Sequence, residues 1–193
     1  MPKLLMVSGS TRTGSTNSKL AALAASIARD AGADVTLIDL KDYDMPLYNG
    51  DLEAESGLPD TAKRLKQVFV EHDGLFLASP EYNSSISPLL KNTLDWISRR
   101  DTPDEPALWA YKGKVAGLGA VGSGALGGLR GLVPLRMMLG NIGVTVVPSQ
   151  VAISHGLSAF DERGALKDER QHGMLKATID QLISTTRALK ATR

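Results

Sequence analysis

The chain alternates short apolar runs with longer helical patterns, and this alternation limits the possible folds most strongly. The runs are almost wholly apolar, as expected of strands buried on both faces. The segments between them carry apolar residues at three- and four-residue spacing, which is typical of helices with one buried stripe. The predicted strands are Leu4–Val7, Val35–Ile38, Leu75–Ala78, Val115–Gly119 and Val144–Val147.

Strands that alternate with helices in this way predict a parallel sheet with helices on both faces and right-handed crossovers. Five strands favour an α/β fold, the flavodoxin-like doubly wound sheet of order 2-1-3-4-5, formed by residues 1–193 as a single domain. In that order the switch point lies between the first and third strands. We therefore expect a ligand at the carboxyl ends of these two strands.

A polar stretch, Ser8–Ser18, follows the first strand and precedes a helix. It contains seven hydroxyls, one amide, one guanidinium and two glycines. The start of a helix contributes oriented N–H groups and a partial positive charge, and an arginine adds a charge-assisted contact. The stretch therefore predicts an anion site, with an ordinary capped turn at Ser15 or Thr16 as the alternative. The candidate ligands in it are Ser10, Arg12, Ser15, Thr16, Asn17 and Ser18.

The spacing of this loop excludes two better-known phosphate loops. No Gly-Lys-Ser/Thr follows, so it is not a Walker A loop, and Gly9 and Gly14 do not fit G-x-G-x-x-G. A nucleoside triphosphate and a dinucleotide held by its pyrophosphate are both disfavoured. Hydroxyls suit a terminal monophosphate, and FMN carries one.

Two more loops follow the third and fourth strands, at the same edge of the predicted sheet. The first offers an aromatic surface, donors, acceptors and an apolar contact, and the second offers bare backbone. A planar ring with polar edges would fit between them. Simple packing of the tyrosine and an ordinary helix entry at the glycines are the alternatives. The candidate residues are Pro80, Tyr82, Asn83, Ser84, Ile86, Gly122, Ser123 and Gly124.

Composition narrows the class of protein further. The formal charge is +1, from 22 basic and 21 acidic residues, so the basic footprint of a nucleic-acid partner is missing. Cysteine is absent and only three histidines occur, which argues against disulfides, thiolate chemistry and a metal site. No apolar run is long enough for a signal peptide or a membrane span. We therefore expect a cytoplasmic protein without nucleic-acid or membrane partners.

Four motifs together resemble one family. They are Ser8-Gly9-Ser10-Thr11-Arg12, Ser15-x-Asn17, Ser79-Pro80-Glu81-Tyr82-Asn83 and Lys91-Asn92-x-x-Asp95-Trp96. With Pro46-Leu47-Tyr48 and Gly127-Gly128-x-Arg130, the match extends from the first strand to about Leu139. The chain is similar to the NADPH-dependent FMN reductases, especially the branch that contains bacterial quinone and chromate reductases.

This resemblance implies an FMN enzyme that takes hydride from NADPH or NADH and passes it, by a ping-pong mechanism, to quinones or similar small acceptors. It implies that Ser10, Arg12, Ser15, Asn17 and Ser18 bind the phosphate. Pro80, Glu81, Tyr82 and Asn83 would line the ribityl chain and ring, and Gly122, Ser123 and Gly124 the pyrimidine edge. A flavodoxin-type electron carrier and a flavin-binding regulatory protein are the alternatives.

The long segment Lys41–Pro59 is predicted to be a loop that flanks the site together with the helix Pro88–Arg100. Leu47, Tyr48 and Trp96 in these segments are expected to form an interface, because exposed apolar patches often mark one. We therefore expect a homodimer or homotetramer, with packing inside one subunit as the alternative. The acids Asp51, Glu53 and Glu55 are interpreted as a solvated face.

Overall fold

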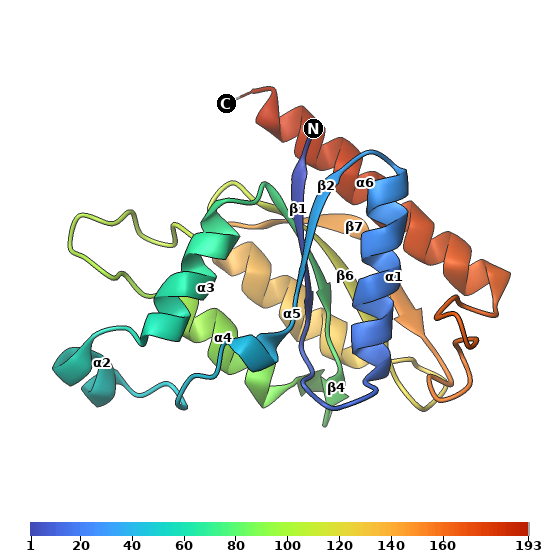
Figure 1. Cartoon of the computed structure of the whole chain (residues 1–193), viewed down its shortest axis with the longest axis horizontal. Coiled ribbons are helices and arrows are strands. Elements are labelled where there is room, and N and C mark those ends of the chain that lie inside the picture. The colour runs from blue at the N-terminus through green and yellow to red at the C-terminus, as the bar shows by residue number, and fades with distance from the viewer. Residues whose placement is uncertain (193) are drawn as a thin grey trace.

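Five parallel strands form the sheet at the centre of the computed structural model, which describes residues 1–192 (Figure 1). Their order, β2-β1-β3-β6-β7, is the predicted 2-1-3-4-5 order once a separate hairpin, β4 (Glu81–Tyr82) and β5 (Ser85–Ile86), is set aside. Every pairing within the sheet is parallel, so the predicted fold class is confirmed. The strands are β1 (Lys3–Ser8), β2 (Asp34–Ile38), β3 (Gly74–Ala78), β6 (Val115–Val121) and β7 (Thr145–Ile153).

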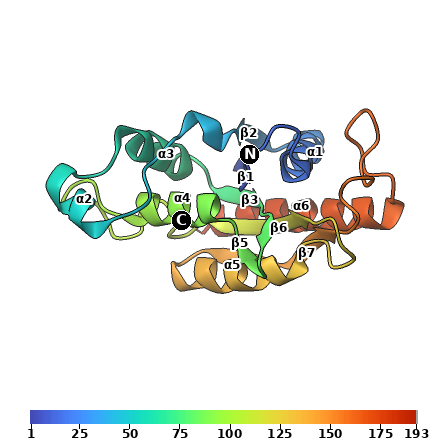
Figure 2. The same ribbon diagram turned by 90° about the horizontal axis from the view of Figure 1, so that it is seen from below.

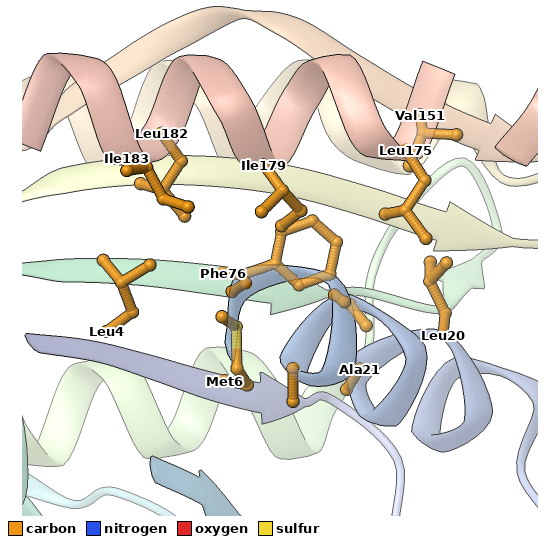
Figure 3. Packing of buried hydrophobic residues seen from close by; sticks show 14 of the residues in the cluster. Leu4, Met6, Leu20, Ala21, Phe76, Val151, Leu175, Ile179, Leu182 and Ile183 are labelled. Atoms are coloured by element: carbon orange, nitrogen blue, oxygen red, sulfur yellow. The ribbon is translucent and has the colours of Figure 1, made fainter. Parts of the chain in front are cut away.

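Helices cover both faces of the sheet because successive side chains of a strand point to opposite sides. Leu4 and Met6 of β1 join the core beneath α1 (Thr16–Asp30) and α6 (Glu169–Lys190), where Phe76 also lies (Figure 3). Leu5 and Val7 join the second core instead. That core lies beneath three helices, α3 (Asp60–Val70), α4 (Pro88–Ser98) and α5 (Leu129–Asn141). The sheet separates α5 from α6 (Figure 2).

The segment 41–59 is not the structureless loop predicted from the sequence. It contains the end of a 3-10 turn, η1 (Leu40–Asp42), and a short helix, α2 (Gly50–Ser56). The Asn49 side chain caps α2 by accepting a hydrogen bond from the Asp51 N–H (2.8 Å). None of the α2 residues is buried, so the helix has no apolar stripe for a sequence pattern to reveal.

Two of the three residues expected at an interface pack inside their own subunit. Trp96 is buried, donates its indole N–H to the Pro46 carbonyl (2.7 Å) and lies edge-on to Tyr48, with ring centroids 5.0 Å apart. Only Leu47 is exposed, at 79%. The prediction that Tyr48 and Trp96 form an exposed patch is therefore wrong.

Glu53 also departs from its predicted place on a solvated face. Its carboxylate accepts hydrogen bonds from the Tyr48 hydroxyl (2.7 Å) and from Arg99 Nε (2.9 Å). Burial opposes ionisation, but the hydrogen bonds from Arg99 and Tyr48 outweigh it and lower the pKa of Glu53. The same carboxylate raises the pKa of Tyr48, because it accepts a hydrogen bond from the phenol and so favours its protonated form. Glu53 thus holds α2 against the end of α4.

The last strand, β7, extends to Ile153, beyond the predicted Val144–Val147. It continues past a bulge that interrupts its pairing with β6. Residues 146 and 150 of β7 pair with residues 116 and 118 of β6, so three residues face one. The Arg136 guanidinium of α5 fills this bulge by donating to the Val147 carbonyl (2.9 Å) and to Gln150 Oε1 (2.9 Å). Partial burial lowers the pKa of Arg136. Pro148 and the polar residues after it hid the continuation of the strand in the sequence.

Candidate functional site

The first loop joins β1 to α1 at the carboxyl edge of the sheet, the lower edge in Figure 1. Ser15 is the N-cap of α1, and its hydroxyl accepts a hydrogen bond from the Ser18 N–H (3.3 Å). The N–H groups of Thr16 and Asn17 have no acceptor within residues 1–192, as expected in the first turn of a helix. Their free donors and the positive end of the helix dipole favour an anion here.

Arg12 adds a cationic side chain to this loop. It is exposed, and its guanidinium forms no hydrogen bond or ion pair with any other described residue. Its backbone is fixed, because its N–H donates to Ser10 Oγ (3.4 Å) and its carbonyl accepts from the Ser15 N–H (3.0 Å). The positive charge is thus placed by the loop and left free for a ligand.

Asn17 and Ser18 also lie in this loop, but their side chains bond to protein. Asn17 is buried, donates its amide to the Val121 carbonyl (3.1 Å) and accepts from the Val121 N–H (2.9 Å). This pair ties the start of α1 to the end of β6. The Ser18 hydroxyl donates to Ser8 Oγ (3.1 Å) and lines a separate cavity on the β2 side of the loop.

A cavity of about 210 Å³ brings the three predicted loops together. Residues of all three polar loops line it, at the carboxyl ends of β1, β3 and β6. Of the predicted residues, it is lined by Ser10, Arg12, Ser15, Thr16, Asn17, Pro80, Glu81, Tyr82, Gly122 and Ser123. Ser18, Asn83, Ser84, Ile86 and Gly124 lie outside its lining.

The second loop folds into the hairpin formed by β4 and β5. Asn83 and Ser84 occupy its two-residue turn with φ of 50° and 65°, the positive values that a type I′ turn requires at both positions. They form the exposed tip. Tyr82 stands beside them and is 54% exposed, so its ring offers a face at the rim of the cavity.

The residues flanking this tip face other cavities. Ile86 lines an apolar groove between α4 and α5, and Gly124 lines a cavity of about 280 Å³ shared with Glu81 and Arg130. The hairpin therefore separates the central cavity from two neighbouring ones. The sequence indicates these residues at the correct edge of the sheet, but it places them all in one pocket.

The segment between β6 and α5 has room only for glycine at two positions, Gly122 and Gly127. A Cβ on Gly122 would lie 2.8 Å from the Gly128 nitrogen, and one on Gly127, with φ of 60°, would lie 2.6 Å from the Ile153 carbonyl carbon. The Gly122 N–H donates to the Ile153 carbonyl (3.1 Å). The N–H groups of Ser123 and Gly124 have no acceptor in the described chain and remain available to a ligand.

Gly156 and Leu157 also line the central cavity, although neither was predicted from the sequence. The Gly156 N–H donates to the Gly122 carbonyl (2.9 Å), and a Cβ on Gly156 would lie 2.5 Å from Val121 Cγ1. The loop after β7 therefore supports the third loop from behind. A lone glycine is a weak sequence signal for a site. In addition, β7 ends six residues beyond its predicted end, so nothing in the sequence indicated that a loop at the carboxyl edge begins here.

Neither a metal-binding cluster nor a membrane-spanning helix occurs in the part of the chain that the structure describes. No group of three or more Asp, Glu or His side chains lies close enough to hold a metal ion within residues 1–192. No described helix has the length and apolar content needed to cross a membrane. What the site offers is a monophosphate-sized anion cradle at one end and backbone donors with an aromatic rim at the other.

The fold is flavodoxin-like, and comparison with known proteins shows the class of protein. A family model described as NADPH-dependent FMN reductase matches residues 2–158, so the chain belongs to that family. The predicted class, an FMN-dependent oxidoreductase with NAD(P)H as co-substrate, is confirmed.

Individual relatives span the whole chain. It is 34% identical over 190 residues to an NAD(P)H-dependent FMN reductase of Pseudomonas aeruginosa, covering 97% of both chains. It is 32% identical over 190 residues to a 2-hydroxy-1,4-benzoquinone reductase of a Burkholderia species, covering 96% of both. Among solved structures, it resembles the flavoenzyme NAD(P)H:(acceptor) oxidoreductase FerB from Paracoccus denitrificans, with a TM-score of 0.81, 25% identity and coverage of 97% and 98%.

Proposed function

We propose that this chain uses bound FMN to pass hydride from NAD(P)H to quinones or similar small acceptors, in a ping-pong reaction at one open face. The observation that carries the proposal is the cavity that unites a free guanidinium and free helix N–H groups with the Tyr82 hairpin and the Gly122 loop. The names of the relatives support a quinone-type acceptor. The names of the family and of its listed relatives, which are reductases, favour an enzyme over the electron carrier and the regulatory protein.

In this proposal each loop has a distinct task. FMN supplies the electron transfer, and the protein binds and orients it. Arg12, the Ser10 and Ser15 hydroxyls and the N–H groups of Thr16 and Asn17 hold the phosphate. Tyr82 covers one rim of the ring, while the N–H groups of Ser123 and Gly124 donate to its polar edge. The side chains of Asn17 and Ser18 hold the loop in shape.

The experiment that tests the proposal starts from the visible spectrum of the purified protein. We expect a flavin spectrum, and rapid bleaching of it when NADPH or NADH is mixed in a stopped-flow instrument. A second mixing with a benzoquinone should restore the absorbance. Calorimetry should show FMN binding far more tightly than FAD, since the cradle suits a terminal monophosphate. Equal affinity for FAD, or no bleaching by either nucleotide, would contradict the proposal.

We also propose a homodimer, with a surface that differs from the one expected from the sequence. The outer face of α5 exposes Val133 by 64% and Met137 by 72%, one turn apart. Beside it, an apolar groove of about 670 Å³ runs between α4 and α5 and reaches Ile86 of the hairpin. Exposed apolar patches of this kind mark interaction sites, and two copies related by a two-fold axis would cover each other's face.

Light scattering after size exclusion tests this assembly. The wild-type protein should have the mass of a dimer or of a tetramer built from dimers, and Met137→Glu should reduce it to a monomer. Leu47→Glu, on the exposed segment first expected at the interface, is the matched control and should leave the mass unchanged. A wild-type monomer at micromolar concentration with full activity would refute the dimer.

A further inference from the structure

The carboxylate of Glu81 faces away from the proposed flavin cavity and toward α5. Oε1 accepts from Arg130 Nε (2.9 Å) and Nη2 (2.8 Å), and Oε2 accepts from the Gly131 N–H (3.2 Å). The Glu81 side chain is only 11% exposed. Both carboxylate oxygens are thus bonded within the protein, while Glu81 also lines the central cavity.

This carboxylate replaces a missing helix cap. The N-cap of α5 is Gly128, which has no side chain, so no capping bond comes from the helix's own sequence. An N-cap side chain normally accepts from the N–H two or three positions into the helix. Gly131 is the third residue of α5, and its N–H donates both to the Gly128 carbonyl (3.2 Å) and to Glu81 Oε2 (3.2 Å). Glu81 thus adds a side-chain acceptor from fifty residues away. Its negative charge also suits the positive end of the helix.

The hairpin needs this contact because it is too small to hold itself. Its strands make two residue pairs, Glu81 with Ile86 and Tyr82 with Ser85, and an isolated hairpin of that size is at best marginal in water. The first turn of α5 approaches it closely. A Cβ on Gly131 would lie 3.0 Å from the Ser85 carbonyl oxygen and 3.3 Å from the Glu81 Cα. The position of β4 is therefore set by α5.

We propose that Glu81 is a positioning residue, which fixes the flavin-facing backbone of residues 80–82 by capping α5 from outside the helix. The proposal rests on the proposed FMN function. Pro80, Glu81 and Tyr82 are consecutive and all line the central cavity, so a tilt of β4 would move the whole wall. Arg130, on the far side of Glu81, acts on the wall only through that carboxylate.

The test compares four variants of the FMN-loaded enzyme. Glu81→Ala removes every bond, Glu81→Gln keeps an acceptor for the Gly131 N–H, and Arg130→Ala removes the ion pair but keeps the cap. Asp180→Ala is the matched control, since it breaks the exposed Lys176–Asp180 pair (2.6 Å) on α6, away from the cavity. The readouts are the visible circular dichroism of bound flavin, its midpoint potential, and kcat and KM.

We expect Glu81→Ala to alter the flavin dichroism and potential and to lower kcat/KM by about tenfold or more, as small misplacements of reacting groups do. Glu81→Gln and Arg130→Ala should each retain part of the activity, and Asp180→Ala all of it. Wild-type dichroism and kcat/KM in Glu81→Ala, with only a lower melting temperature, would overturn the proposal.

Two further outcomes keep the test decisive. If Glu81→Ala does not fold, Glu81→Gln and Arg130→Ala carry the comparison, and wild-type flavin dichroism and kcat/KM in both would overturn the proposal. If the wild-type protein binds no FMN, the proposed function itself fails. Normal FMN binding and turnover in the wild type, unchanged in the Glu81 variants, refutes the positioning role alone.

Discussion

The two polar loops at the switch point are built in opposite ways. The first is shaped mainly by its own residues, since Ser15 caps the helix that follows and the Arg12 carbonyl accepts the Ser15 N–H. The hairpin after β3 is shaped by distant residues, because Arg130 and Gly131 hold it across some fifty positions of the chain. The conformation of a locally built loop should be little affected by substitutions elsewhere in the protein. A loop held by distant residues should shift when those residues are substituted.

The largest expected effect on stability lies in the glycine-rich segment between β6 and α5, the helix that holds the hairpin. Gly127→Ala should destabilise the protein by more than about 3 kcal/mol, because its Cβ would meet the backbone of β7 at 2.6 Å in a positive-φ conformation. Gly124→Ala is the control and should change little, since nothing lies within 4 Å of the added carbon. Urea unfolding of both apo proteins measures the difference. Similar midpoints would show that this loop yields to the added carbon.

In the locally built loop, the main effect should fall on the ligand and not on the fold. Arg12→Ala should weaken FMN binding by about 1.5–3 kcal/mol, the cost of losing a charged hydrogen bond. The apo melting temperature should stay the same, because the guanidinium has no partner among the described residues. Lys19→Ala, exposed on α1, is the control for charge. Calorimetry with FMN that shows no change for Arg12→Ala would assign this side chain to solvent.

The tip of the hairpin should show a smaller effect that depends on backbone conformation. Asn83→Ala should cost about 1 kcal/mol, because alanine tolerates the left-handed backbone at φ of 50° less well than asparagine does. Asn83→Gly should be close to neutral. If thermal melts rank alanine and glycine equally, the turn adopts another conformation in solution. We also expect Asn83→Ala and Tyr82→Ala to lower the steady-state rate of NAD(P)H oxidation. Expressed as a free energy, this loss should exceed the loss of stability of the apo protein.

The smallest effect is expected where Glu53 of α2 pairs with Arg99 at the end of α4. The folded-state pKa of Glu53 is lowered, so its stabilising contribution is present above the ordinary value of 4.5 and is lost as the pH falls through the folded value. The pair is partly exposed, with Arg99 at 48%, so we expect less than about 1 kcal/mol. Urea unfolding should show that Glu53→Gln destabilises the protein at pH 7 and that this difference shrinks as the pH falls progressively below 4.5. An unchanged loss over this pH range would attribute the effect to packing.

The same contrast explains what the sequence could predict. The strands, their order and the first loop follow from apolar runs, glycines and a local cap, and these are read from neighbouring residues. The hairpin, the roles of Glu81 and Asn17, and the support from Gly156 depend on partners 34 to 104 positions away. α2 was missed because none of its residues is fully buried and Leu52 alone packs partly against the core, too little for an apolar stripe. The end of β7 was missed because its bulge breaks the apolar pattern.

The bulge in β7 also limits how copies of this protein can associate. β7 is an edge of the sheet, and an edge strand with free backbone groups is a template for another strand. Here Pro148 has no N–H to offer, and Arg136 takes the carbonyls of Val146 and Val147. A foreign strand therefore finds neither a regular row of donors nor a regular row of acceptors. At the β7 edge the sheet cannot readily extend from molecule to molecule into an aggregate, which agrees with the interface that we propose on the outer face of α5.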